Sequence, residues 1–214
     1  MLKIAIFGAG GQAGTAAVIE ASARGHRVTA LRRADADITN PQAVARAAFG
    51  QDVAIGAVAP ADGDPAGFYR AAASSLAAGL VEAGVDRLVW VSIASLLPNA
   101  AGVAPVDAEG FPAEYRPFSL GHRAALEVFT GSDLIWTAVS PAGDFDRHRS
   151  PQGGYTMTAV GDPSARITYA DHARAIVDLA EQPGVRGEHV GVLPPSPDAP
   201  AEPGEGGAAR ADRQ

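Results

Sequence analysis

Short apolar runs alternate with helical patterns along most of the chain. Apolar runs that end at or near glycine, such as residues 2–7 and 53–58, are typical of buried parallel strands. Between these runs, apolar residues recur at helical spacing. The pattern predicts strands at 2–7, 27–31, 53–58, 87–92, 134–139 and 187–192, with helices at 11–24, 41–49, 65–84, 117–130 and 169–182.

Helix-end signals support this order of elements. Gly25 is placed to stop the first helix, and Asn40 followed by Pro41 is a typical helix start. Thr168 is placed to cap the last helix. Because strands and helices alternate throughout, we expect a Rossmann-like α/β fold: a doubly wound parallel sheet with helices on both faces. The strand at 187–192 is expected at the edge of that sheet.

The 214 residues are long enough for one sizeable core and short for two. We assign residues 1–192 to a single nucleotide-binding domain. Two segments rich in glycine and proline, 93–116 and 140–165, are expected to be irregular loops that shape a substrate region. Residues 193–214 are rich in proline, alanine, glycine and acidic residues, which predicts a disordered tail.

The charge and cysteine content narrow the classes of partner. A formal net charge of -7 argues against nucleic acid or an anionic membrane surface as a partner. The absence of cysteine excludes disulfides, thiolate nucleophiles and cysteine-ligated metals. No apolar run approaches the roughly 18 residues of a membrane span, and the N-terminus does not have the pattern of a signal peptide. The cytoplasm is therefore the expected location.

A glycine-rich segment at residues 7–14 directly follows the first predicted strand and opens the first predicted helix. Gly8 permits a tight turn, and Gly14 permits close packing of helix against strand. This strand–turn–helix context predicts a dinucleotide site, with a merely structural turn or a mononucleotide site as the alternatives.

The expected phosphate contacts come from the backbone. Gly10 and Gly11 would let the chain approach the pyrophosphate closely. The N–H groups of Gly11, Gln12 and Ala13 would point at the anion from the positive end of the helix.

Two arginines indicate which dinucleotide binds. A NAD site commonly has an acidic residue at the end of the second strand, where this chain has Arg32 and Arg33. A guanidinium can pair with the 2′-phosphate of NADP(H), and no carboxylate stands at that point. The residues therefore favour NADP(H) over NAD(H), although the two arginines could also belong to a solvated turn.

Segments beyond the glycine loop support a family assignment. They are IFGAGGQAG (6–14), RGHRVTALRR (24–33), DITNP (37–41), AGVDRLVWVS (83–92), FPAEYRPFSLGHRAALEVF (111–129), LIWTAVSPAGDF (134–145) and RITYADHARAIVD (166–178). With these segments the chain resembles the atypical short-chain dehydrogenase/reductase group. Within that group it is most similar to the NAD(P)H-binding, NADH-flavin reductase-like or NmrA-like family. The resemblance covers residues 1–192.

The resemblance implies further cofactor contacts. It places Arg33 at the family's arginine position. Ser92, at the end of the fourth predicted strand, is also expected to contact the cofactor. The resemblance implies that Asp37 and Ile38 lie near the adenine. It also implies that Ala57, Val58 and Ala59 lie beside the ribose.

The chain departs from the better-known enzymes of the group where they carry out chemistry. Their Tyr-x-x-x-Lys dyad would fall at Ser119 and Arg123, and the only lysine of the chain is Lys3. Proton transfer by that dyad is therefore excluded. Hydride transfer from nicotinamide to a flavin does not need the dyad, since the protein supplies mainly a stacking pocket and orientation. Flavin would then be a substrate rather than a tightly held cofactor.

Four side chains are candidates at the substrate end of the sheet. Ser92 and Ser95 could donate hydrogen bonds to a substrate or be ordinary loop serines. His122 could supply a proton or lie on a solvated helix face. Tyr115 could cover the nicotinamide or be a packing aromatic. We take Ser92, Ser119 and His122 as the candidate catalytic residues.

Two other constellations carry less weight. Asp144, Asp146 and His148 are loosely spaced on a loop, so no metal site is predicted. Asp171 and His172 resemble part of a hydrolase triad, but the sequence lacks a Gly-x-Ser-x-Gly nucleophile motif. Asp171 is better explained as a carboxylate in the first turn of a helix.

The sequence supports two main hypotheses. The first is an NAD(P)H-dependent oxidoreductase that passes hydride from NADPH to a small-molecule acceptor, a flavin or a quinone-like compound. The second is a non-catalytic, redox-sensing protein that reports the NADPH/NADP⁺ ratio. Reduction of a small carbonyl compound, with Ser119 or His122 as the proton source, is a third and weaker hypothesis.

Overall fold

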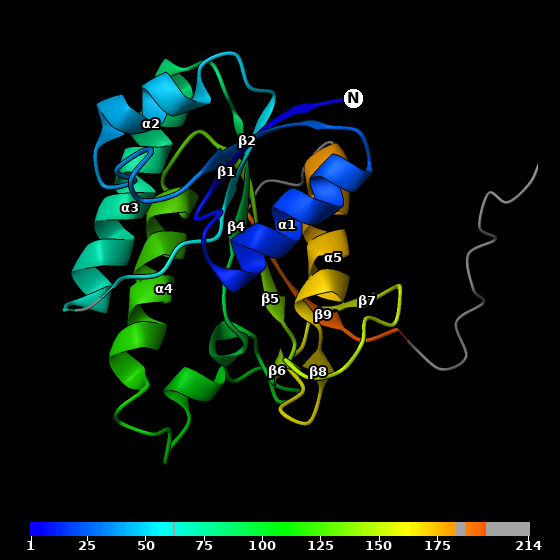
Figure 1. Ribbon diagram of the computed structural model, residues 1–214. Helices are drawn as coiled ribbons and strands as arrows, with labels where there is room; N and C mark the ends of the chain where they lie inside the picture. Colours follow the sequence, from blue (N-terminus) through cyan, green and yellow to red (C-terminus); the bar gives the residue numbers. More distant parts are fainter. Residues whose placement is uncertain (62, 183–186, 196–214) are drawn as a thin grey trace, which may run out of the picture.

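A seven-stranded sheet runs through the middle of the molecule (Figure 1). The computed structural model describes residues 1–61, 63–182 and 187–195. The strands of the main sheet are β1 (Lys3–Phe7), β2 (Arg27–Leu31), β3 (Val53–Gly56), β4 (Arg87–Val91), β5 (Ile135–Pro141), β7 (Thr156–Thr158) and β9 (Glu188–Leu193). A second, two-stranded sheet pairs β6 (Asp144–Phe145) with β8 (Arg166–Ile167).

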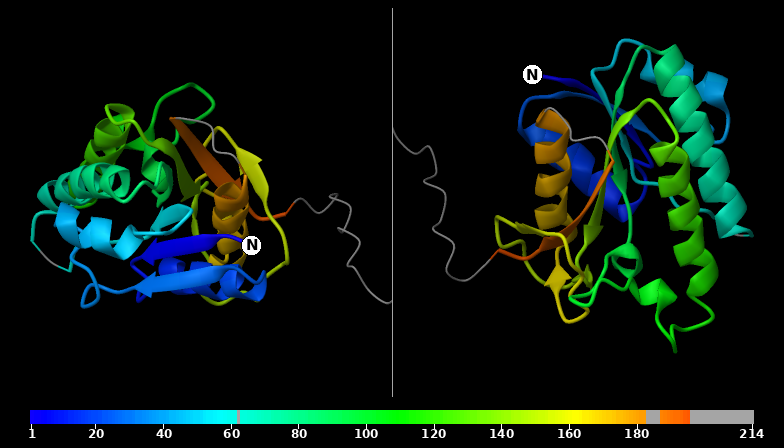
Figure 2. Two further views of the ribbon diagram at one scale, coloured as in Figure 1. Left: turned by 90° about the horizontal axis from the view of Figure 1, so that it is seen from above. Right: turned by 180° about the vertical axis from the view of Figure 1, so that it is seen from behind.

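Helices cover both faces of the main sheet, as Figure 2 shows. One face carries α1 (Gln12–Ala23) and α5 (Tyr169–Glu181). The opposite face carries α2 (Pro41–Ala48), α3 (Pro65–Glu82) and α4 (Arg116–Thr130). Two short 3-10 helices, η1 (Ala94–Leu96) and η2 (Pro105–Asp107), lie between β4 and α4.

The strand order is β2-β1-β3-β4-β5-β9-β7, and all neighbours are parallel except β7 and β9. The chain leaves β1 toward β2 on one side and then crosses to β3 on the other side of β1. Such a reversal leaves a crevice at the carboxyl ends of the strands, where open α/β sheets bind their ligands. The expected doubly wound α/β fold is confirmed.

Two hydrophobic cores lie on the two faces of the sheet. Along β1, Ile4 and Ile6 pack toward α1 and α5, whereas Ala5 and Phe7 pack toward α2, α3 and α4. Successive side chains of a strand point to opposite faces, so a strand that is buried on both faces reads as one continuous apolar run. This is why β1 was recognisable from its sequence.

The structure corrects details of three expectations about the second half of the chain. The last strand is internal, because β9 pairs with β5 on one side and with antiparallel β7 on the other. The segment 140–165 is only partly irregular, since it contains the end of β5 together with β6 and β7, and the segment 93–116 contains η1 and η2. Leu193 belongs to β9, while residues 196–214 of the expected disordered tail lie outside the described residues.

The predicted helix starts are confirmed. The Asn40 side chain accepts hydrogen bonds from the N–H groups of Gln42 and Ala43 at the start of α2. Thr168 accepts one from the N–H of Asp171 at 3.0 Å and donates its hydroxyl to the Asp171 carboxylate at 2.7 Å. Backbone N–H groups of the preceding segment, at residues 152 and 153, also donate to that carboxylate.

Within the described ranges, none of the helices combines the length and the apolar character that a membrane crossing requires.

We expect Thr168→Ala to lower the free energy of unfolding by about 1–2 kcal/mol, because it removes the cap of α5 and one partner of a buried carboxylate. Thr168→Ser keeps the hydroxyl and should retain most of the stability. Urea unfolding of the three proteins at neutral pH measures the difference. Equal stability of the alanine and serine variants would contradict a capping role.

Candidate active site

The turn between β1 and α1 depends on two glycines. Gly8 has φ 86°, a left-handed conformation that other residues rarely adopt, and its N–H donates to the Leu31 carbonyl at 2.9 Å. A Cβ at Gly8 would lie 2.1 Å from the Ala57 carbonyl oxygen. A Cβ at Gly14 would lie 2.1 Å from the carbonyl oxygen of Gly8. Neither position can therefore hold a side chain, in agreement with their expected roles.

The structure corrects one detail of the expected phosphate loop. The N–H of Gly11 donates to the Gly8 carbonyl at 3.0 Å, so this group closes the turn and is not free for an anion. Gly11 caps α1 without a side-chain hydrogen bond. Gln12 and Ala13 form the first turn of the helix behind it.

A cavity of about 610 Å³ lies at the carboxyl ends of β1, β2 and β3. Most of the predicted cofactor residues line it together: Gly8, Gly10, Gly11, Arg32, Arg33, Asp37, Ile38, Ala57, Val58 and Ala59. Gln12, Ala13 and Gly14 are not among the lining residues, and Ser92 lines a different cavity. Phe68 and Thr39 also line the cavity and were not singled out from the sequence.

The two arginines of this cavity differ in their contacts. A Cβ on Gly10 would come within 3.7 Å of the Arg32 Cγ, so the stem of Arg32 lies beside the glycine loop. Arg33 donates to the Ala59 carbonyl at 3.3 Å. Asp37 is engaged locally: the hydroxyl of Thr39 and then its backbone N–H hold the pKa of the Asp37 carboxyl below its usual range.

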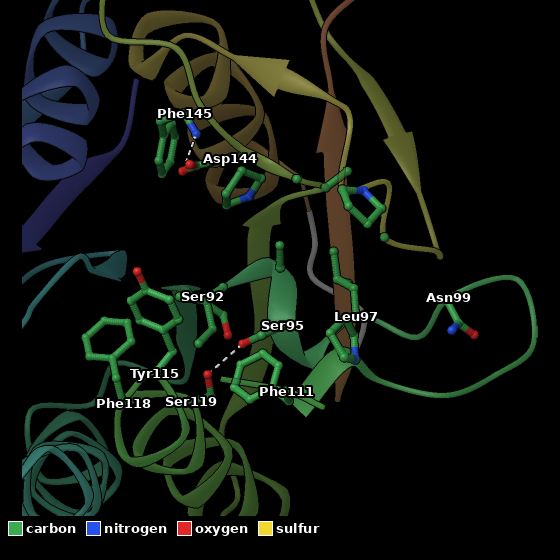
Figure 3. A pocket seen from close by; sticks show the side chains of 18 of the residues that line it. Ser92, Ser95, Leu97, Asn99, Phe111, Tyr115, Phe118, Ser119, Asp144 and Phe145 are labelled. Carbon is green, nitrogen blue, oxygen red and sulfur yellow. Dashed lines mark hydrogen bonds between the residues drawn. The ribbon is translucent and has the colours of Figure 1, made fainter. Parts of the chain in front are cut away.

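A second cavity, of about 620 Å³, lies at the carboxyl ends of β4 and β5 (Figure 3). Its wall is mostly apolar and includes four aromatic side chains. Phe111, Tyr115 and Phe118 come from one side, and Phe145 lies across from them. The side chain of Tyr115 is exposed and that of Phe118 partly exposed, so these two rings form part of the open rim.

Three serines supply hydroxyls to this apolar cavity. Ser95 and Ser119 are hydrogen-bonded through their hydroxyls at 2.9 Å. The Ser92 hydroxyl is buried and finds no hydrogen-bond partner among the described residues. Leaving a buried hydroxyl without a partner costs free energy, so Ser92 stays a candidate for a ligand contact.

His122 does not take the expected position. It is 3% exposed, lies outside the cavity lining, and packs against Tyr69 with ring centroids 4.0 Å apart. Burial, with a smaller contribution from the charge of His189, lowers the pKa of His122 to about 3. The imidazole is therefore neutral at physiological pH. His122 lies on the side of α4 that packs into the core. It is therefore neither on a solvated helix face nor in a position to donate a proton to a molecule in the cavity.

His172 and Asp171 do not form a catalytic pair either. The Asp171 carboxylate is occupied by the cap of α5, and His172 is fully buried against the edge of Phe145. Neither ring nitrogen of His172 has a hydrogen-bond partner within the part of the chain that the structure describes. Burial lowers its pKa to about 3.

Most of the aromatic wall of the second cavity was not predicted from the sequence. Phe111 lies between Gly110 and Pro112, and Phe145 lies between Asp144 and Asp146, both in the segments expected to be loops. Phe118 lies in the first turn of α4. The sequence did contain one signal for this wall: aromatic residues lie in segments that begin at the carboxyl ends of predicted parallel strands.

Comparisons with known proteins agree with this geometry. Residues 31–183 match the model of a family described as NAD(P)H-binding. A Bacillus subtilis (strain 168) protein, the uncharacterised YwnB, is 33% identical, and the match covers 90% of this chain and 98% of that protein.

Solved structures show the same fold. A structure from Streptococcus pneumoniae TIGR4, provisionally named an NADH-flavin reductase, is 26% identical with a TM-score of 0.80; the match covers 91% of this chain and all of that one. A structure from Burkholderia pseudomallei, provisionally named an exported protein, is 36% identical with a TM-score of 0.79, and it covers 90% of this chain and all of that one.

We expect stability to fall as the pH is lowered from about 6.5 to 4. Burial also lowers the pKa of His189, to about 4. Because an exposed histidine titrates near pH 6.5, the unfolded chain binds more protons than the folded one in this window. Each such histidine contributes up to about 1.4 kcal/mol per pH unit. Urea unfolding at several pH values measures the slope.

His122→Phe should reduce that slope and cost little stability at pH 7, since the ring keeps its aromatic neighbours. His148, exposed on the segment between β6 and β7, is the matched position for a control substitution to Phe. A slope that is unchanged in His122→Phe would contradict the assignment of a buried neutral imidazole.

Proposed function

This chain belongs to the NAD(P)H-binding family, and on that basis we propose that it is an NADPH-dependent reductase for a flat aromatic acceptor of the flavin or quinone type. The observation that carries the proposal is the pairing of two cavities at the same edge of the sheet. One is built for a dinucleotide, and the other is apolar, aromatic and lined by hydroxyls. The proposal includes the cytoplasm as the location, in keeping with the lack of cysteine.

The first cavity fits a dinucleotide on two grounds. The turn formed by Gly8 and Gly14 excludes side chains, which leaves open backbone beside the start of α1. Arg32 and Arg33 add two cations to the same cavity, where a 2′-phosphate can be paired. In this proposal the adenosine half lies against Ile38 and the ends of β2 and β3.

When bound, NADPH supplies a hydride, which reduces the acceptor by two electrons and leaves NADP⁺. The part of the protein is to orient the two ring systems and to exclude water. Ser92 directly follows β4 and lines the second cavity, and β4 pairs with β3, whose end borders the first cavity. Its free hydroxyl can donate a hydrogen bond to an acceptor carbonyl or ring nitrogen, and so hold the ring in place.

The second cavity favours a planar acceptor. Aromatic rings on opposite sides of an apolar slot stack well on a flat conjugated ring. Ser119 and Ser95 form a hydroxyl pair on the same wall, which can pass a proton to a reduced acceptor from solvent. No tyrosine–lysine dyad is needed for this transfer, because reduced flavins and quinones take their protons readily from hydroxyls and water.

The direct test is NADPH oxidation by the purified protein, followed by the loss of nicotinamide absorbance, with FMN, FAD or menadione added. Acceptor-dependent turnover is expected. If NADPH binds tightly but none of these acceptors supports turnover, the proposed reductase activity is contradicted. Selective binding of one redox state would then favour the redox sensor, since a ligand bound equally well in both states shifts nothing.

We expect Arg32→Ala and Arg33→Ala each to raise the KM for NADPH about tenfold or more and to change the KM for NADH little. The reason is that a charge-assisted hydrogen bond to the 2′-phosphate is worth about 1.5–3 kcal/mol. Arg46→Ala, on the exposed side of α2, is the matched control. Equal losses with NADPH and NADH would contradict the proposed preference for NADPH.

Ser92→Ala should lower kcat/KM for the acceptor about tenfold while the free energy of unfolding is unchanged or rises slightly. The hydroxyl has no partner among the described residues, so its removal costs the fold nothing, whereas the bound acceptor loses a hydrogen bond. Ser75→Ala, in a buried position on α3 outside both cavities, is the control. A stability loss in Ser92→Ala that matches the activity loss would show a structural role instead.

A further inference from the structure

Two arginines of α4 reach the segment that precedes the helix. Arg116 and Arg123 are seven residues apart, which places them on one face of the helix two turns apart. Arg123 makes a bidentate pair with Asp107: Nη1 to Oδ1 at 2.8 Å and Nη2 to Oδ2 at 2.6 Å. Arg116 donates to the Val106 carbonyl at 2.7 Å, and its guanidinium lies 5.5 Å from the centroid of the Phe111 ring.

The segment held in this way is one wall of the acceptor cavity. Pro105, Phe111 and Pro112 line that cavity, and the neighbouring Val106 is fully buried. The backbone hydrogen bonds of the segment are local, for example from the N–H of Asp107 to the Ala104 carbonyl and from that of Ala108 to the Pro105 carbonyl. One further bond, from the N–H of Tyr115 to the Pro112 carbonyl at 3.2 Å, reaches the start of α4. The side chains of Arg116 and Arg123 add a connection from the body of the helix to residues 106 and 107.

We propose that Arg123, together with Arg116, is a positioning residue that holds residues 105–112 as the outer wall of the acceptor cavity and thereby selects planar acceptors. The inference rests on the proposed function, because it assigns an acceptor to this cavity. The wall sets the width of the slot between Phe111 and the opposite side at Phe145. Loosening the wall widens the slot, which weakens the binding of a flat ring and leaves the dinucleotide cavity untouched.

The ion pair between Arg123 and Asp107, here called the clamp, should weaken as the salt concentration rises. The Asp107 side chain is 50% exposed and that of Arg123 is 33% exposed, so water and ions screen their attraction. Hydrogen bonding to Arg123 lowers the pKa of Asp107, and the pair stays charged at neutral pH. The bidentate geometry is the feature that gives such an exposed pair a measurable effect.

Charge reversal tests the pair. Arg123→Asp and Asp107→Arg should each raise the KM for menadione about fivefold with little change in kcat, which corresponds to about 1 kcal/mol. The double variant Arg123→Asp/Asp107→Arg restores the attraction and should return KM to within about twofold of wild type. The KM for NADPH should not change in any of the three. Two single variants with unchanged menadione KM, or a double variant no better than the singles, would overturn the proposal.

The control pair is Arg70 and Glu127, which joins α3 to α4 at 3.6 Å, outside the cavity lining. Arg70→Gln and Glu127→Gln each break an exposed ion pair that also involves α4. They should leave the KM for menadione and its salt dependence unchanged. A KM rise equal to that of the clamp variants would show a general effect on α4 and would overturn the positioning role.

Hydrogen exchange separates failure of the clamp from failure of the proposed function. The amides of Asp107, Ala108 and Phe111 should exchange several times faster in Arg123→Asp than in wild type, and slow again in the double variant. This readout needs no acceptor and no turnover. Wild-type exchange rates in Arg123→Asp would contradict the clamp, even if the protein is an active reductase. Fast exchange in that variant of a protein without turnover would support the clamp and contradict only the assignment of an acceptor to the cavity.

Discussion

The rest of the structure depends on one close approach of backbone to backbone, between Gly8 and Gly14. The carbonyl of Gly8 occupies the space that a Cβ of Gly14 would need, so helix α1 begins directly against the end of β1. This contact fixes where the chain turns after β1, the strand that pairs with β2 on one side and with β3 on the other. The crevice that results is lined by the ends of three strands, and both candidate arginines project from one of its borders.

The two cavities are built by different means. The dinucleotide cavity is formed by backbone turns at the ends of strands, where glycine is required and side chains matter less. The cavity proposed for the acceptor is formed by side chains from α4 and from the segments after β4 and β5. The positions where the resemblance places a tyrosine–lysine dyad hold Ser119, which lines this second cavity, and Arg123, which pairs with Asp107. At the position of the dyad's lysine, Arg123 thus forms an ion pair with Asp107.

Histidines illustrate why polar residues were harder to place than apolar ones. His122 and His172 lie on the apolar faces of α4 and α5, yet imidazole is compatible with either water or a core. Burial of both rings lowers their pKa values, so they behave as neutral aromatic side chains that fill space. Neighbouring rings such as Tyr69 and Phe145, which are distant in sequence, decided this outcome.

The sequence by itself determined the layered α/β fold, the helix caps at Asn40 and Thr168, and the glycine turn, because the order of apolar runs, the capping residues and the glycine spacing can be recognised in short stretches of chain. It also identified most residues of the dinucleotide cavity, since consecutive parallel strands end at one edge of the sheet. Only the tertiary structure decided that β9 is internal, that His122 is buried, and that Phe111, Phe118 and Phe145 form one cavity with Ser92. Those outcomes depend on packing between segments far apart in the chain, and no local pattern records which side chains will meet.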